Sequence, residues 1–422
     1  MSNLNEMAKL ARQAARSLAI IETERKDQAL MRLADLLVDE TEPILSANAE
    51  DVRLAQQAGL ATALIDRLRL SEAGVMALAA DVRNVAQLSD PVGSVFDRDM
   101  LPNGLKVHKQ RVPIGVLAVI YESRPNVTVD VSCLALKSGN AVILRGGKET
   151  LNTNRALFKI IQQALRDSAT PMGAVQFVDS QDRADVLALI QLDQEVDMLI
   201  PRGGAGLHRF CREHSRIPVM TGGIGICHLF VDRSADQAAA LAIIHNAKTQ
   251  RPSVCNALDT VLVDRAIADD FIPALIGHLR QAGVVIRLDP AAMACIQEGD
   301  YAPGEVFLAG PKDFDTEWLS LVLGVRVVGG VAEAIDHIQA HSTGHSDGIL
   351  TRDAHNTNLF TQQVDSAAVY VNASTRFTDG GQLGLGAEVA VSTQRLHARG
   401  PMALEALTTY KWVIIGDNHI RE

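Results

Sequence analysis

The chain has 422 residues and a formal net charge of −10; 47% of its residues are hydrophobic and only 4% are aromatic. This length exceeds the usual size of one hydrophobic core, so we expect two or three domains with aliphatic cores. The acidic balance argues against a nucleic-acid partner, which normally leaves a basic footprint. No stretch approaches the roughly 20 apolar residues that cross a bilayer, so no membrane partner is expected.

Cysteine usage argues against a disulfide framework and against a structural metal. The cysteines lie far apart, and no CxxC pair, HExxH motif or zinc-like spacing occurs. The first 24 residues carry charges throughout and contain no apolar signal core. We therefore expect a reduced, cytoplasmic enzyme without a metal. The five cysteines are Cys133, Cys211, Cys227, Cys255 and Cys295.

The first 90 or so residues predict helices only. Apolar residues recur at helical spacing, for example at Leu30, Leu33 and Leu37. Ser71 is expected to cap the following helix, because serine is a favoured N-cap residue. Nothing in this region carries obvious chemistry. We interpret it as a helical layer packed on a sheet.

From about residue 105 the pattern changes to strands that alternate with helices. The strands are nearly continuous apolar runs, which is typical of a parallel sheet covered on both faces. We expect strands at 116–120, 141–144, 175–178 and 198–200, and helices at 127–137, 154–165, 184–190 and 205–214. A second unit repeats the alternation, with helices at 236–248 and 266–281 and strands at 260–263 and 284–288. Glycines at 222–225 mark a domain boundary. The predicted fold class is α/β, with two Rossmann-like parallel-sheet domains.

Cys255 is the candidate nucleophile. It lies in a polar turn directly before a strand-like run at 257–263, with Arg251 four residues before it and Asn256 immediately after it. This setting suits a partly exposed thiol whose thiolate is stabilised by charge and hydrogen-bond donors. A buried cysteine without a chemical role is the alternative, and the local sequence favours neither.

Two turns at strand ends carry cations and glycines, although a GxGxxG fingerprint and a Walker A loop are both absent. Arg145 and Lys148 follow one strand and precede a helix, where ligands bind in open parallel sheets. Arg202, Gly203 and Gly204 repeat the arrangement later in the chain, and their backbone suits a pyrophosphate at a helix start. An ordinary basic turn is the alternative for each of them.

Two polar segments complete the candidate site. Asn126 follows the strongest strand and is either an amide donor to a developing oxyanion or the N-cap of the next helix. Arg376 lies in the polar run 372–381 and would pair with a carboxylate or phosphate; a solvated loop is the alternative. His341 and His345 are interpreted as loop residues and not as metal ligands.

The order of these loops resembles the aldehyde dehydrogenase superfamily, and four motifs resemble its gamma-glutamyl phosphate reductase family more closely. The resemblance runs from about residue 5 to 418. The motifs are Gln-Arg-Pro-Ser-Val-Cys-Asn-Ala-Leu-Asp-Thr at 250–260, Tyr-Glu-Ser-Arg-Pro-Asn at 121–126, the 331–349 stretch with Gly-His-Ser-Asp, and Val-Tyr-Val-Asn-Ala-Ser-Thr-Arg-Phe-Thr-Asp-Gly-Gly at 369–381.

The resemblance implies NADPH-dependent reduction of L-glutamyl 5-phosphate to L-glutamate 5-semialdehyde, a step of proline biosynthesis. It implies that Cys255 is the nucleophile and Asn126 the oxyanion donor. Cofactor contacts are then expected at the two cationic turns and at Glu317, and substrate contacts in two polar loops. The cofactor set is Arg145, Lys148, Arg202, Gly203, Gly204 and Glu317, and the substrate set is Arg124, Ser374 and Arg376.

One departure from the wider superfamily bears on the chemistry. Hydrolytic relatives place a glutamate just before the paired glycines, where it activates water, whereas Val219, Met220 and Thr221 occupy that stretch here. An enzyme that must not hydrolyse its thioester has reason to lack this base. A coenzyme A-acylating aldehyde dehydrogenase and a non-catalytic scaffold of the same fold are the rival interpretations.

The resemblance also implies how the chain is divided and what it binds. Residues 1–104 and 117–225 would form the cofactor-binding domain, and 226–365 the catalytic domain. Residues 105–116 and 366–422 would form an oligomerisation arm and a return segment to the cofactor domain. We therefore expect a homo-oligomer, and we expect glutamate 5-kinase, the enzyme upstream in the pathway, as a possible physical partner.

Overall fold

The computed structural model describes residues 2–60, 62–222, 224–297, 299 and 301–421. The chain forms two compact units. Unit 1 comprises Met1–Thr221, Gly384–Ala390 and Met402–Glu422, and unit 2 comprises Gly222–Leu383 and Val391–Pro401. The first crossing lies at the glycines where the sequence places a boundary. The chain then crosses back near 383 and not near 365, so residues 366–383 belong with unit 2 and not with a return segment.

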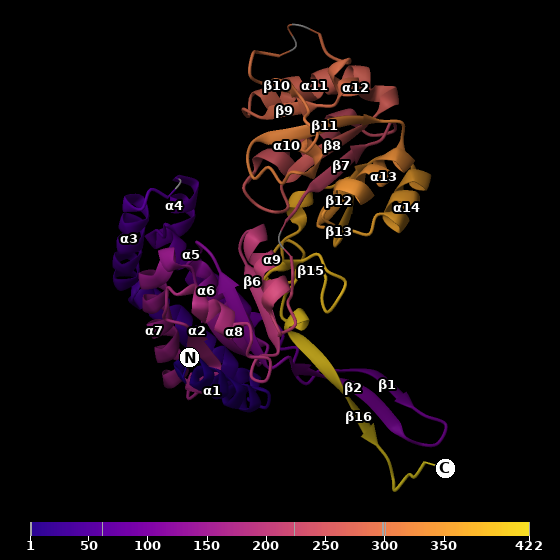
Figure 1. The fold of residues 1–422 in the computed structure, drawn as a ribbon. Helices are drawn as coiled ribbons and strands as arrows, with labels where there is room; N and C mark the ends of the chain where they lie inside the picture. The colour runs from indigo at the N-terminus through magenta and orange to yellow at the C-terminus, as the bar shows by residue number, and fades with distance from the viewer. Residues whose placement is uncertain (1, 61, 223, 298, 300, 422) are drawn as a thin grey trace. The chain divides into compact units, whose positions relative to one another are not determined.

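Unit 1 begins with helices, as the sequence predicts. They are α1 (Ser2–Leu18), α2 (Thr23–Asp39), α3 (Thr41–Gln57), α4 (Thr62–Leu68) and α5 (Glu72–Gln87). The Ser71 side chain caps α5, because its Oγ accepts a hydrogen bond of 3.1 Å from the Gly74 amide. Helix α2 packs on α5 and on α7 (Leu151–Asp167), so the helices form a layer over the sheet (Figure 1).

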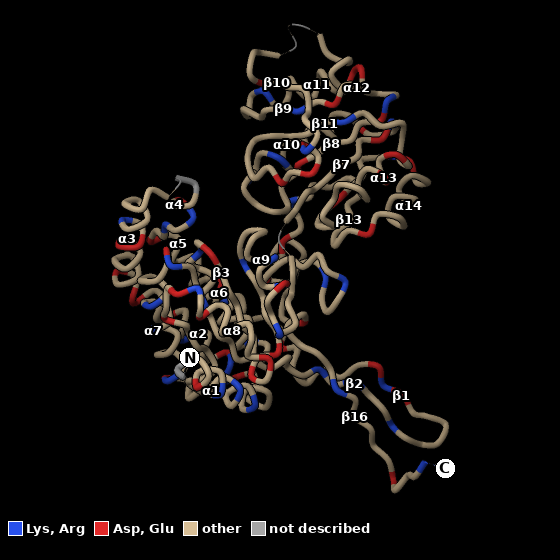
Figure 2. Tube along the Cα trace, viewed as in Figure 1, with Lys and Arg blue, Asp and Glu red and all other residues tan. Residues whose placement is uncertain are grey.

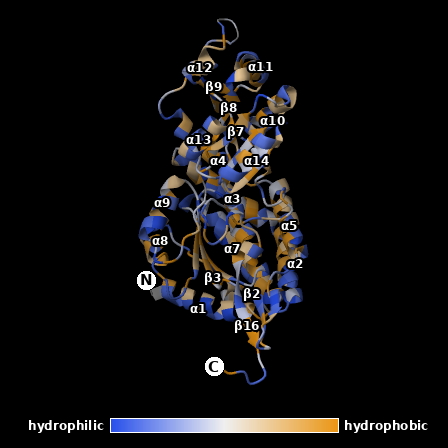
Figure 3. Cartoon of the chain, turned by 90° about the vertical axis from the view of Figure 1, so that its right-hand side faces the viewer, coloured by the Kyte–Doolittle hydropathy of each residue, from blue (hydrophilic) through white to orange (hydrophobic). Residues whose placement is uncertain are grey.

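The sheet of unit 1 is parallel, with the strand order β5-β4-β3-β6 among the described residues. Every residue of the central strand β3 is buried, as its uninterrupted apolar sequence predicts, and Figure 3 shows this region as hydrophobic. The remaining helices follow the strands in alternation. The bounds are β3 (Val116–Tyr121), α6 (Asn126–Lys137), β4 (Ala141–Arg145), β5 (Val175–Phe177), α8 (Arg183–Leu189), β6 (Met198–Arg202) and α9 (Ala205–His214).

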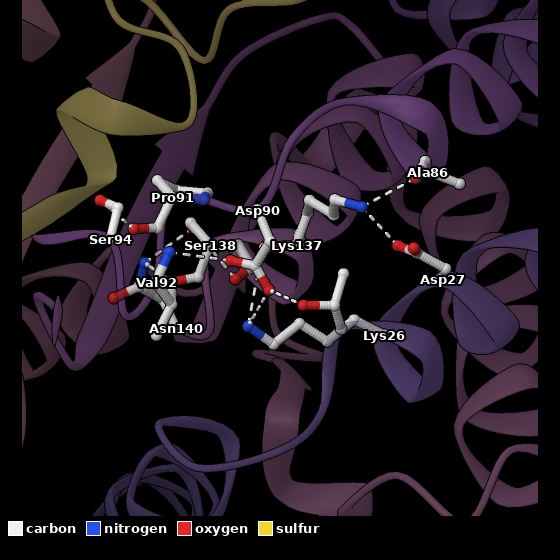
Figure 4. A network of polar contacts seen from close by, with 12 residues as sticks. Lys26, Asp27, Ala86, Asp90, Pro91, Val92, Ser94, Lys137, Ser138 and Asn140 are labelled. Atoms are coloured by element: carbon white, nitrogen blue, oxygen red, sulfur yellow. Dashed lines mark hydrogen bonds and ion pairs between the residues drawn. The ribbon is translucent and has the colours of Figure 1, made fainter. Parts of the chain in front are cut away.

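A buried polar network fixes the helical layer to the chain that leads into the next sheet (Figure 4). The Lys26 ammonium, on α2, donates a hydrogen bond of 2.8 Å to the Asp90 carboxylate. The same carboxylate accepts a hydrogen bond of 2.9 Å from the Val92 amide. Lys137, at the end of α6, donates 2.7 Å to the Ala86 carbonyl and pairs with Asp27. Both lysines are almost fully buried, and each buried charge has a carboxylate partner, as burial requires.

An antiparallel sheet of β1 (Val95–Met100), β2 (Lys106–Pro113) and β16 (Thr408–Ile415) extends from the rest of unit 1 (Figure 1). We call it the arm. β1 pairs with β2, so the arm begins earlier than the expected 105–116 segment. β16 carries apolar side chains on its exposed surface, and Figure 3 shows it as hydrophobic. The exposed members are Tyr410, Trp412, Ile414 and Ile415, with exposed fractions of 47%, 55%, 62% and 53%.

The described residues of unit 2 form a second parallel sheet, ordered β10-β9-β11-β8-β7-β12-β13. One apolar core lies between the sheet and α10 (Gln237–Thr249), α11 (Ala268–Arg280) and α12 (Pro290–Met293). A second core joins the other face to α13 (Val331–His341) and α14 (Ala354–Gln363). The strands are β7 (Cys227–Val231), β8 (Leu258–Asp264), β9 (Val285–Leu288), β10 (Val306–Leu308), β11 (Val322–Val328), β12 (Ser346–Leu350) and β13 (Ala368–Val371).

Acidic and basic residues are interspersed along both units (Figure 2). Among the described residues, no helix combines the length and the apolar character needed to span a membrane. Across the same residues, no group of three or more His, Cys, Asp or Glu side chains is arranged to hold a metal ion.

Candidate active site

Cys255 occupies a tight turn between α10 and β8. The Ala257 amide donates 3.1 Å to the Val254 carbonyl, so Cys255 and Asn256 are the two central residues of the turn. The thiol is partly exposed, in contrast to the fully buried Cys133 and Cys211. The polar turn and the partial exposure are what the sequence predicts for a reactive cysteine.

The main-chain carbonyl of Cys255 packs against residues 225–227, near the start of unit 2. The Cys227 Sγ, on β7, lies 3.2 Å from the Cys255 carbonyl oxygen and donates to it. A Cβ added at Gly225 would lie 1.6 Å from the same oxygen, so only glycine fits there. The Gly225 amide donates 2.9 Å to Glu317 Oε1. The structure therefore places Glu317 on the main chain behind Cys255, and its expected contact with a nicotinamide ribose stays a prediction.

Arg376 and Ser374 lie on the chain that follows β13, and Arg376 contacts the cysteine turn and Gln250 before it. The Arg376 guanidinium donates 3.0 Å to Gln250 Oε1 and also donates to Asn256 Oδ1. Burial lowers the pKa of Arg376, and the charge of Arg251 lowers it further, whereas Asp379 and Cys255 raise it. The buried Ser374 Oγ accepts 3.3 Å from the Arg376 amide. Arg376 is thus within electrostatic range of the nucleophile, and Ser374 fixes the turn that carries it.

Asn126 is the first residue of α6, in unit 1, and its side chain does not cap that helix. The N-cap interpretation is therefore wrong. Instead, the Asn126 Nδ2 donates 2.8 Å to Asp130 Oδ2, one helical turn further on. Burial raises the pKa of Asp130 to about 7; Asp81 raises it too, while the Asn126 hydrogen bond and Arg202 lower it. A side-chain amide has two N–H donors. The hydrogen bond to Asp130 uses one donor of Asn126 and orients the amide, so the second donor stays available for a substrate.

The first cationic turn is held largely by its own backbone. The buried Arg145 guanidinium donates 2.9 Å to the Gly146 carbonyl and 3.3 Å to the Asp182 carbonyl, while its Nε finds no partner among the described residues. Lys148 is exposed at the start of a short 3-10 helix. Arg145 is the last residue of β4 and Lys148 follows three residues later, as expected for a turn at a strand end, and the cofactor contacts remain predictions.

The second cationic turn leads into α9 and receives a carboxylate from its own unit. The Gly204 amide donates 3.0 Å to Glu122 Oε2, and a Cβ at Gly203 would lie 2.4 Å from the same oxygen. Arg202 has a buried Nε without a hydrogen-bond partner in the described part of the chain. Burial, together with the positive charge of Arg202, lowers the pKa of His208 to about 4. Arg124 lies in the loop between Glu122 and α6.

Sequence reasoning missed three residues that organise these groups. Asp130 was detectable, because an amide and a carboxylate four residues apart on a helix face are neighbours. Glu122 belongs to the polar loop that drew attention through Asn126. Cys227 gave no signal, since it begins an apolar strand and looks like an ordinary small core residue.

Comparison with known proteins places the chain. The model of the aldehyde dehydrogenase family matches residues 1–295. A gamma-glutamyl phosphate reductase of Photorhabdus laumondii is 57% identical over 99% of this chain and 100% of its own length. The solved gamma-glutamyl phosphate reductase of Thermotoga maritima has a TM-score of 0.95 and 45% identity, covering 99% of this chain and 100% of that one. An engineered glycolyl-CoA reductase with bound NADP+ shares the fold alone, with a TM-score of 0.70 and 15% identity over 98% of this chain and 97% of that one.

Two parallel α/β sheets and a partly exposed cysteine in a turn, together with the family match, define an oxidoreductase of the aldehyde dehydrogenase class. Such an enzyme uses a nicotinamide cofactor and acts on a small molecule. Within this class, the chain belongs to the gamma-glutamyl phosphate reductases, because it matches them over nearly its whole length. The fold class and the family inferred from the motifs are confirmed.

Proposed function

We propose that this chain reduces L-glutamyl 5-phosphate to L-glutamate 5-semialdehyde in proline biosynthesis, with NADPH as the reductant. The observation that carries the proposal is the full-length match to gamma-glutamyl phosphate reductases at 57% identity, with a partly exposed Cys255 in a turn. The names of those relatives supply the substrate class. The residues of this chain supply the mechanism that follows.

The Cys255 thiolate attacks the acyl carbon, and the carbonyl oxygen becomes an oxyanion. Asn126 Nδ2 and the Cys255 amide are the proposed donors to that oxyanion; losing one such donor typically costs about 3–4 kcal/mol. When the intermediate collapses, the C–O bond to phosphate breaks and phosphate leaves as the anion, which gives a thioester on Cys255. When bound, NADPH would supply the hydride that reduces this thioester. Cys255 then leaves as thiolate when the hemithioacetal collapses to the aldehyde.

The stretch before Gly222 supports reduction over hydrolysis. Val219, Met220 and Thr221 provide no carboxylate to take a proton from water. A thioester in such a site has no general base on this segment to activate water against it. This favours an acyl phosphate reductase over an aldehyde oxidiser that releases a free acid.

Arg376 is proposed to bind an anionic group of the substrate, with Arg124 and Ser374 as further contacts. Support comes from its place beside the cysteine turn and from its electrostatic coupling to Cys255. A planar guanidinium binds carboxylate or phosphate through two parallel hydrogen bonds. Arg376→Glu should raise the substrate KM sharply, and an unchanged KM would remove Arg376 from the substrate site.

The two cationic turns are proposed to hold NADPH. The donor set fits an anionic dinucleotide: α9 presents its N-terminus after two glycines, and Arg145 and Arg202 each keep a buried Nε without a partner in the described residues. Lys148, three residues after β4, adds an exposed ammonium. Glu317 is retained as a candidate ribose contact.

The arm is proposed to join copies of this chain into a homo-oligomer. Its strand β16 exposes Tyr410, Trp412 and Ile414 on one face at 47% or more, and such contiguous apolar surface normally marks an interface. Sedimentation of Trp412→Asp should show a smaller species. A cytoplasmic location and a contact with glutamate 5-kinase remain proposals, which fractionation and co-purification would test.

The proposed function is tested by running the reaction in the reverse direction, as oxidation of the aldehyde, because the acyl phosphate is labile. Glutamate 5-semialdehyde, phosphate and NADP⁺ should yield reduced cofactor, followed at its absorbance. Cys255→Ser should abolish turnover while NADPH binding persists, because serine lacks the thiolate. Cys295→Ser is the matched control, since Cys295 is also partly exposed in unit 2.

Substituting coenzyme A for phosphate separates the main rival. Turnover that requires coenzyme A and ignores phosphate would identify an acylating aldehyde dehydrogenase. A Cys255→Ser variant with near-normal turnover would refute the nucleophile assignment. A wild-type protein that consumes none of these substrates and has no reactive thiol would be a scaffold.

A further inference from the structure

The carbonyl oxygen of Cys255 is the point at which several buried groups of unit 2 meet. It accepts a hydrogen bond of 3.2 Å from the Cys227 Sγ, and it lies so close to Gly225 that no Cβ fits there. The peptide that bears this carbonyl follows the Cα of Cys255 directly. Its orientation therefore sets the direction in which the Cys255 side chain leaves the turn.

We propose that Cys227 is a positioning residue for the nucleophile: its thiol donates a hydrogen bond to the Cys255 carbonyl and thereby fixes the direction of the reacting thiolate. Cys227 does not touch the substrate in this scheme, and its thiol is not consumed. The proposal rests on Cys255 being the nucleophile of the proposed function.

The protonated form of Cys227 is the one present at ordinary pH. Its side chain is fully buried, and burial raises its pKa well above the ordinary value. The negative charges of Asp259, Asp347, Cys255 and Glu317 raise that pKa further. When Cys255 is a thiolate, its charge raises the pKa of Cys227, so Cys227 keeps its proton. Two neighbouring thiols are thereby assigned different roles, one as donor and one as nucleophile.

An irregularity in the sheet aims Cys227 at the turn. Cys227 pairs with Leu258 and His228 pairs with Thr260, so Asp259 is the extra residue of a β-bulge between β7 and β8. Bulges re-aim side chains and are frequent beside active sites. The Asp259 carboxylate accepts hydrogen bonds from the Cys227 amide and, at 3.1 Å, from the Trp318 amide. The bulged residue therefore fixes the main chain of Cys227 itself.

A buried lysine keeps the bulged carboxylate in place. The Lys248 Nζ lies 3.5 Å from Asp259 Oδ1 and donates 2.8 Å to the Leu258 carbonyl, and both side chains are at least 97% buried. Trp318 follows Glu317, whose carboxylate holds the Gly225 amide at 2.9 Å. The groups on both sides of the Cys255 carbonyl are thus connected through Asp259. Such a network tolerates little displacement, because Lys248 and Asp259 at its centre are buried and need their partners.

The test compares donor and non-donor side chains at position 227 in the full-length protein. Cys227→Ala and Cys227→Val remove the donor with a smaller and a larger side chain, and Cys227→Ser restores a donor. We expect kcat in the reverse assay to fall about tenfold in the first two with little change in KM, because small misplacements of a reacting group cost rate more than binding. Cys227→Ser should recover kcat to within about threefold of wild type.

Cys295→Ala is the matched control, since the Cys295 Sγ donates to the Ala291 carbonyl at 3.3 Å in the same unit. It loses the same kind of bond away from the turn and should keep wild-type kcat. Alkylation of Cys255 by iodoacetamide, measured on its peptide by mass, is a second readout that needs no substrate. Its rate should change at least threefold in Cys227→Ala and return toward wild type in Cys227→Ser.

Three results would overturn the proposal: wild-type kcat and alkylation in Cys227→Ala and Cys227→Val, equal kcat losses in the serine and alanine variants, or kcat losses that follow the melting temperature alone. An altered alkylation rate in a protein without reverse activity would support the positioning role and refute the proposed function. The two hypotheses therefore fail separately.

Discussion

The nucleophile and the proposed oxyanion donor are held by different kinds of contact. Around Cys255 in unit 2, the main chain is held by a thiol, a glycine that admits no side chain, and a hydrogen-bonded turn. Around Asn126 in unit 1, the amide is held by the carboxylate of Asp130, whose pKa is raised to about 7. The position of Cys255 therefore depends on close steric contacts, whereas the orientation of Asn126 depends on the charge of a carboxylate. Steric changes should therefore damage unit 2 most, and pH should act mainly through unit 1.

The largest effect is expected from Gly225→Ala. The new Cβ would lie 1.6 Å from the Cys255 carbonyl oxygen, closer than any real contact, so the turn or the 222–225 segment must move. We expect kcat to fall by about 100-fold or more, because a displacement near 1 Å at a reacting group costs that much. Steady-state reverse kinetics measure it.

Gly277→Ala provides the matched control for that substitution. Gly277 lies inside α11, and a Cβ there would meet nothing within 4 Å. Alanine favours helix, so this variant should keep full activity and gain about 0.5–1 kcal/mol of stability. A Gly225→Ala enzyme with near-normal kcat would show that the Cys255 turn tolerates displacement, and the contrast between the units would fail.

The alternation of strands and helices in this chain was predictable, and so was the cysteine turn. Local sequence specifies both strands, since β3 is an uninterrupted apolar run and β8 contains the apolar residues 261–263 at its centre. The polar neighbours of Cys255 left partial exposure and burial equally open, and the structure shows the partly exposed thiol. In contrast, the sequence placed residues 366–383 in the arm and return segment, whereas the structure places them in unit 2. The reason is that β13 pairs with β12 in the second sheet, and no local pattern reveals that pairing.

Contacts between distant residues account for what the sequence did not show at the site. Cys227 and Cys255 are 28 residues apart, and their hydrogen bond depends on a bulge that only the paired strands display. The Glu122 contact with Gly204 spans 82 residues and brings two strand ends together. Asp130 is the exception, because its partner lies one helical turn away and both residues are visible in the sequence.

A smaller effect, and one that depends on pH, is expected at Asp130. Asp130→Leu should lower kcat about tenfold, less than the 10²–10³-fold cost of losing an oxyanion donor, because Asn126 remains but is no longer oriented. In wild type, kcat should fall as pH drops through about 7, where Asp130 gains a proton and becomes a weaker acceptor. Asp130→Asn should lack that limb, since an amide oxygen accepts at every pH.

The stability of the protein should move in the opposite direction. The folded pKa of Asp130 is above the ordinary value of about 3.9, so the folded state holds more protons between these pH values. The free energy of unfolding contributed by this group is therefore greatest at low pH and is lost as pH rises through about 7. Asp81, Arg202 and Cys133 are the titratable or charged groups that face it. Identical kcat profiles for wild type and Asp130→Asn would remove Asp130 from the site.

The smallest effect is expected at the second cationic turn, where Glu122 tests whether charge governs unit 1. Its carboxylate accepts the Gly204 amide at the start of α9, the position assigned to a phosphate of the cofactor. Glu122→Gln removes a negative charge that competes with that phosphate, so the Kd for NADPH should fall about two- to fivefold at low ionic strength. Glu213→Gln, near the other end of α9, carries the same charge change and should leave Kd unaltered. Fluorescence titration with NADPH measures both variants. Weaker binding in Glu122→Gln would mean that Glu122 orders the turn for the cofactor, and charge competition would then not describe this edge of unit 1.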